Sequence, residues 1–172
     1  MDGQLKNLIR VGRVSSVNPA AGTARVAFEH QGIVSNDLQV LVPQTLQNKD
    51  YFMPDIGEHV VCLFLPTGNQ EGFILGAIYS NQDKPAATAD SNKRQVKFAD
   101  GTWIEYDRSS HELTVYAVGT VNITAAGSVN ITGDVNITGD VNVSGDVVAI
   151  DIILVNHVHK ENDIGQTTDP PQ

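Results

Sequence analysis

The sequence predicts an all-β protein: an N-terminal OB-fold barrel followed by an intertwined trimeric, triple-stranded β-helix with a pointed C-terminal apex. Two observations support this. Short apolar runs separated by Gly- and Pro-containing turns fill the first half. Residues 127–150 then repeat every six residues, with Gly-Asp-Val-Asn-Ile-Thr as the typical unit. Since six is even, Gly, Val and Ile fall on one strand face, and Asp, Asn and Thr fall on the other.

The N-terminal part, residues 1–85, is expected to hold an arm and the barrel. Residues 4–10 predict a short helical turn or an extended arm. The following apolar runs have the number and spacing of strands in a small Greek-key barrel such as an OB-fold. Five strands are expected at 11–17, 23–28, 40–43, 58–65 and 72–79.

Residues 86–95 are expected to form a linker because they contain almost no large apolar side chains. Beyond it, residues 96–154 are expected to form the stalk and residues 155–172 the apex and tail. The stalk begins with three short strands, predicted at 95–98, 102–106 and 112–116 from their apolar and aromatic residues and intervening turns.

An unbroken alternation runs from Leu113 to Ala149. Every odd position is Gly, Ala, Leu, Val or Ile, and eleven of these positions carry Leu, Val or Ile. Strands in globular proteins usually have 5–6 residues. At ~3.3 Å per residue this segment would span on the order of 120 Å, against a radius of gyration near ~15 Å for a compact domain of this length. One small globule cannot bury such a strand.

Burial of each of the eleven side chains is worth roughly 1.5–3 kcal/mol, and a wet face of this kind would aggregate. Three chains wound around one axis would bury all three rows and pair their backbones. Glycine at every sixth residue fits positions where strands crowd the axis or change direction. The pattern therefore predicts a homotrimer.

Two other structures could produce a six-residue period. A single-chain left-handed β-helix, as in hexapeptide acyltransferases, needs more hexads than the four present and normally has an aliphatic residue before Gly. A disordered Gly/Ser/Thr linker would not keep regular Val and Ile. The trimeric stalk explains both features.

His157 and His159, two residues apart near the C-terminus, are candidate metal ligands. In an extended strand both point to one face. In a monomer, two solvated histidines are the simpler interpretation. Around a three-fold axis, six imidazoles would suffice for an octahedral site, and imidazole suits Fe, Zn, Cu or Ni. The alternation breaks between 148 and 156, so parity alone does not direct these histidines inward.

Composition argues against several classes of function. The net charge of −9 opposes nucleic-acid binding, which needs a basic surface. Cys62 lies in an apolar run and is expected to be a buried hydrophobe. His30, His59 and His111 are isolated and are expected to be ordinary residues. No nucleophile–base pair or phosphate loop is recognisable, so no enzyme is expected. Without a signal peptide or membrane-spanning run, a soluble protein made in a cytoplasm is expected.

Several segments together resemble the baseplate assembly protein V family, the central spike proteins of contractile-tailed phages. The order of barrel, stalk and paired histidines is the most specific feature. The matching segments are Pro54–Pro66, Glu71–Tyr79, Asp100–Tyr106, the Val-Asn-Ile-Thr repeats and His157-Val-His159.

The resemblance implies a virion protein of the tail baseplate, assembled in the host cytoplasm. It implies that His157 and His159 of three chains hold one iron ion at the apex. It also implies contact with baseplate hub and tail tube proteins, and piercing of the host outer membrane when the sheath contracts. A hexapeptide-repeat acyltransferase-like trimer is the alternative from the enzyme class, and an OB-fold that captures single strands is the alternative from the binding class.

Overall fold

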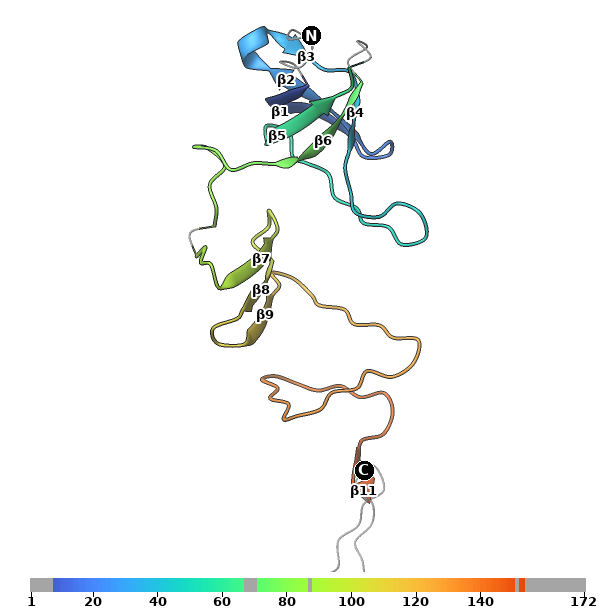
Figure 1. Ribbon diagram of the computed structural model, residues 1–172. Coiled ribbons are helices and arrows are strands. Elements are labelled where there is room, and N and C mark those ends of the chain that lie inside the picture. The colour runs from blue at the N-terminus through green and yellow to red at the C-terminus, as the bar shows by residue number, and fades with distance from the viewer. Residues whose placement is uncertain (1–7, 67–70, 87, 151, 154–172) are drawn as a thin grey trace, which may run out of the picture. The chain divides into compact units, whose positions relative to one another are not determined.

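The computed structural model describes residues 8–66, 71–86, 88–150 and 152–153 (Figure 1). The chain separates into two compact units, Met1–Thr120 and Val121–Gln172. The described residues contain strands and one 3-10 turn, η1 (Glu29–Gln31), but no α-helix. The prediction of an all-β protein is therefore confirmed for the described part of the chain.

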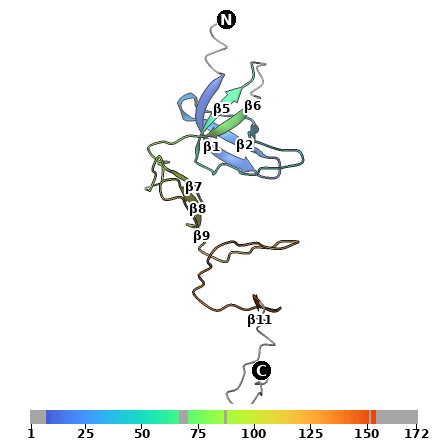
Figure 2. The same cartoon turned by 60° about the horizontal axis from the view of Figure 1, so that its bottom comes forward.

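Five strands close into a barrel. Each strand pairs with two neighbours, in the circuit β1-β5-β6-β4-β2 and back to β1, and β4 with β6 is the parallel pair. Numbered one to five along the chain, these strands follow the order 1-2-3-5-4-1. The barrel is visible in Figures 1 and 2. The strands are β1 (Ile9–Asn18), β2 (Thr23–Phe28), β4 (Leu38–Val40), β5 (His59–Phe64) and β6 (Gly72–Ala77). The topology confirms an OB-like barrel.

The barrel core follows the two-residue period of its strands. Alternate side chains of β2 and β5 point inward, and Val14, Leu38 and Ile74 complete the core from the other strands. Phe28 and Phe64 meet edge to face with ring centroids 5.7 Å apart. The buried residues are Val14, Ala24, Val26, Phe28, Leu38, Val60, Cys62, Phe64 and Ile74.

Three details differ from the sequence expectation. β1 begins at Ile9, because Ile9 and Arg10 pair with Leu63 and Cys62, so these residues form strand and not a helical turn. The third barrel strand begins at Leu38 because that side chain is fully buried and its backbone pairs with Ala24. The added strand β3 (Ile33–Val34) pairs with β2 and was not expected, because two exposed residues leave no periodic signal.

A second sheet follows the barrel in the chain. It is antiparallel, in the order β7 (Lys93–Lys97), β8 (Trp103–Asp107) and β9 (Glu112–Tyr116). β7 begins inside the segment 86–95 that was expected to be linker, because Lys93 pairs with Asp107 across the sheet. The remaining strands, β10 (Val148–Ala149) and β11 (Ile152–Ile153), form a short hairpin.

Gly12 provides a test of the barrel packing. A Cβ atom there would lie 2.6 Å from Cγ1 of Val26 and 2.7 Å from the carbonyl oxygen of Ala27. We expect Gly12→Ala to lower the free energy of unfolding by about 1–3 kcal/mol through overpacking, measured by urea denaturation. Ser16→Ala, at an exposed position of the same strand, should change it by less than about 0.5 kcal/mol. Equal stability of the two variants would contradict the close approach at Gly12.

Candidate functional site: the apolar row of the repeat

The apolar side chains of the alternating segment have no partner layer within the described chain. All eleven Leu, Val and Ile side chains at odd positions from Leu113 to Val147 are between 41% and 75% exposed. Between β9 and β10 the chain forms no ladder with another described strand, and its ribbon runs without arrows in Figures 1 and 2. A continuous apolar row of this length on one chain marks an interaction surface.

Bends in the repeat recur with the sequence period. Gly133 and Gly139, one hexad apart, have φ angles of +128° and +127°. A Cβ at either glycine would meet no atom within 4 Å of this chain, so the backbone conformation and not crowding by its own chain requires glycine there. Two successive hexads thus share one backbone bend at their glycine, whereas Gly127 and Gly145 do not adopt it.

The alternation ends in a turn. Ile150, with φ +56°, separates the paired strands β10 and β11. This turn falls within residues 148–156, where apolar residues no longer keep to the odd positions. The candidate ligands His157 and His159 lie outside the described residues, so their assignment stays a prediction.

The three other histidines do not gather into a metal site in the described part of the chain, where no group of three or more potential ligands occurs. His59 has a specific structural contact: its Nδ1 lies 2.6 Å from Oδ2 of Asp83, which also accepts a hydrogen bond of 2.9 Å from Ser80. The hydrogen bond from His59, which has the larger effect, and the one from Ser80 lower the pKa of Asp83. Sequence gave no signal for this contact, since 24 residues separate the partners.

Cys62 lies in the barrel core and is fully buried. Burial raises the pKa of its thiol to about 11, so it stays protonated at neutral pH. This is the environment of a packing residue and not of a reactive nucleophile.

The barrel's charges do not form a simple basic groove. Arg25 donates to Asp37 at 2.7 Å, and Nε of Arg13 lies 3.7 Å from the carboxylate of Glu29. Two arginines are thus partly neutralised by neighbouring carboxylates, which weakens the case for phosphate binding. Among the helical segments of the described chain, none is long and apolar enough to cross a membrane.

Comparison with known proteins gives a relative that is similar over most of the chain. No family model matches the chain. The chain is 32% identical over 125 residues to the spike protein of Escherichia phage P2. The similar region covers 73% of this chain, and it spans 58% of the length of that relative.

The relative bears the name of a structural protein, which agrees with the prediction that the chain is not an enzyme and gives no support to an acyltransferase. The barrel topology, the apolar row on the repeat and this similarity over most of the chain lead to one assignment. The chain is related over most of its length to a phage spike protein, which supports a place in the phage baseplate spike family.

Proposed function

We propose that the chain forms the central, membrane-piercing spike of a contractile phage tail or a related tail-like particle. The relative is named a spike protein, which supports a role at the tail baseplate. The finer parts of the proposal are a homotrimeric stalk, a metal-bearing tip, attachment to hub and tail tube proteins, and entry through the host outer membrane.

The unpaired apolar row from Leu113 to Val147 carries the proposal for a trimer. One chain leaves this row in water, whereas three chains around an axis would cover all three rows at once. The opposite positions hold mainly Asn, Asp, Thr and Ser, which suit the outside of a solvated rod. Since each chain would share its core with two others, none could leave without exposing the rest.

Such a stalk suits axial load. Force along the rod would act on contacts distributed over its whole length, and local fraying would expose apolar side chains of all three chains. The baseplate end would be anchored through hub and tube proteins, and the other end would meet the host outer membrane when the sheath contracts. The virion baseplate is therefore the proposed location, after assembly in the host cytoplasm.

At the apex, His157 and His159 of three chains would hold one iron ion. The donor set fits a transition metal, because neutral imidazole is a common ligand and six would fill an octahedron. A filled coordination sphere leaves no place for substrate, so the metal would have a structural role. It would tie together three strand ends, where fraying is greatest.

Native mass spectrometry tests the assembly. We expect a species of about 55 kDa, three times the 18.5 kDa chain, that persists on dilution. An extended shape should accompany it in sedimentation analysis, because the stalk is long for its mass. A folded monomer at micromolar concentration would contradict the proposed spike.

A further inference from the structure

The sheet of β7, β8 and β9 has one mainly apolar face, with Arg94 at its β7 edge, and one mainly polar face. On the apolar face, Val96 and Val115 flank Ile104, and Leu113 pairs with Tyr106. These five side chains are 41–67% exposed. A three-stranded sheet normally covers such a face with a second layer, since its stability depends on that burial.

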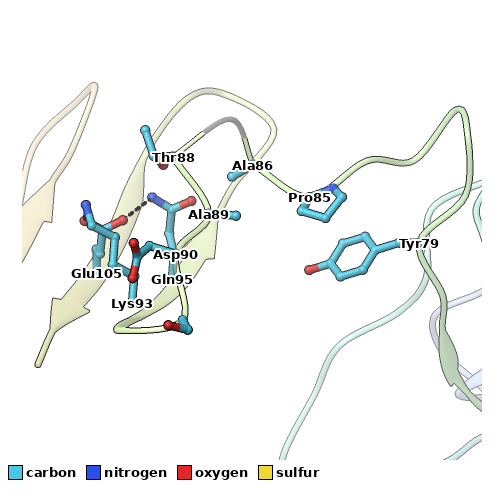
Figure 3. Close-up of a pocket in the computed structure, with 10 residues that line it drawn as sticks. Tyr79, Pro85, Ala86, Thr88, Ala89, Asp90, Lys93, Gln95 and Glu105 are labelled. Carbon is cyan, nitrogen blue, oxygen red and sulfur yellow. Dashed lines mark hydrogen bonds and ion pairs between the residues drawn. The ribbon is translucent and has the colours of Figure 1, made fainter.

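The opposite face is satisfied by its own contacts. Nζ of Lys93 and Nε2 of Gln95 each lie 2.9 Å from an oxygen of Glu105. Figure 3 shows this cluster. Trp103 and Tyr116 stack on the same face with ring centroids 6.0 Å apart.

The segment before β7 also lies on the polar side. Thr88, Ala89 and Asp90 line a pocket together with Gln95 and Glu105 (Figure 3). The Glu105 side chain is only 13% exposed. The chain thus covers the polar face of this sheet and leaves the apolar face open.

In the sequence, the residues of the apolar face lead into the row of the repeat. Leu113 and Val115 belong to both, and the same odd parity runs on through Ala117 and Val121. A partner that covers the row from Leu113 onward would therefore also cover the β9 part of the sheet face. In a homotrimer this partner is the same face of the other copies.

The repeat cannot define its own alignment well. The hexads beginning at Gly133 and Gly139 differ only at their last two positions, Ile137-Thr138 against Val143-Ser144. A slip of six residues would keep Gly on Gly, Val on Val and Asn on Asn, so little free energy separates the alignments. The sheet has no such repeat, because its apolar face is built from residues of different size on three strands.

We propose that the apolar face of the β7–β8–β9 sheet packs against the same face of two further copies and sets the register of the three stalks. This inference rests on the proposed trimer. It assigns separate roles to the two parts: the repeat gives the stalk its length, and the sheet aligns the three chains.

Ile104→Asn tests the sheet, because Ile104 is the central side chain of the apolar face. Lys97→Asn is the matched control: it introduces the same residue at an exposed position of the opposite face. Trp103 fluorescence reports whether the sheet is folded in Ile104→Asn, since the stack of Trp103 with Tyr116 lies on the face opposite to Ile104. For Lys97→Asn, whose side chain is next to Trp103 on that face, far-UV circular dichroism reports the fold instead.

Register is read by disulfide cross-linking in a Cys62→Ala background. Chains carrying Val135→Cys or Val141→Cys, with different tags, are refolded together. A disulfide that joins two cysteines at the same position, 135 to 135 or 141 to 141, reports aligned stalks. A disulfide between position 135 of one chain and position 141 of another reports a slip of one hexad. We expect Ile104→Asn to raise the slipped fraction about tenfold, which corresponds to about 1.4 kcal/mol of lost register preference. Lys97→Asn should leave it unchanged.

The outcomes separate the two proposals. Two results for Ile104→Asn would support the sheet as the aligning element, provided that Lys97→Asn does not show them. These results are slipped trimers, or monomers that keep the native Trp103 signal. Fully aligned trimers of Ile104→Asn would overturn that role and leave the trimeric spike intact. A monomeric parent chain would instead refute the spike itself.

Discussion

The Ile137→Asp variant is expected to fail to assemble. Ile137 lies in the middle of the repeat, 62% exposed in one chain, and would be buried at the axis of a trimer. The substitution removes about 1.5–3 kcal/mol of burial in each of three chains. It also brings three carboxylates towards one axis, where ionised side chains without partners are strongly unfavourable. Native mass spectrometry should show monomers or aggregates in place of a 55 kDa species.

Asn136→Asp is the matched control. It introduces the same charge one residue away, on the face where the repeat already carries Asp134 and Asp140. The trimer should persist, with a thermal midpoint close to the parent. Assembly of Ile137→Asp as readily as Asn136→Asp would show that the apolar row is not the trimer core.

Replacement of both His157 and His159 by Ala should abolish metal binding. The parent, purified without chelator, is expected to contain about one iron per three chains, as one six-imidazole site requires. Elemental analysis by inductively coupled plasma mass spectrometry should find the metal absent from the double variant. The trimer should remain, because the stalk supplies most of the proposed burial.

His30→Ala is the control for that experiment. His30 is exposed in the 3-10 turn after β2 and belongs to no ligand group of the described chain, so its loss should leave the iron content unchanged. A parent protein that holds no iron, or a double variant that keeps it, would refute the assignment of the tip.

Most barrel strands could be predicted from sequence because each combines an apolar run with a clear turn. β2 matches its predicted bounds of residues 23–28. The short β3 escaped prediction because two exposed residues carry no period. β7 begins at Lys93, two residues before the predicted strand 95–98. This start was hidden for a different reason: Lys93 and Arg94 are charged, and the partner strand stabilises Lys93 through Glu105.

The candidate site divides in the same way. The apolar row could be predicted because the alternation of apolar and polar residues along a strand is a local property of the sequence. The exposure of this row in one chain agrees with the proposal of an interior shared between chains. The contact between His59 and Asp83 could not be predicted from the sequence, because it depends on how the fold brings distant residues together. The tip histidines depend in addition on the turn at Ile150, beyond which parity no longer predicts direction.

The matching conformations of Gly133 and Gly139 have a consequence for evolution. The hexads that begin at Gly133 and Gly139 carry the same backbone bend, and the even period of six keeps the same side chains on the same strand face. Duplication or deletion of one hexad would therefore leave the residues on both sides in their original orientation, whereas an insertion of odd length would invert one flank. The length of the proposed spike could thus be adjusted in steps of at most ~20 Å without redesign of the ends, which would offer a simple path for adaptation to cell envelopes of different thickness.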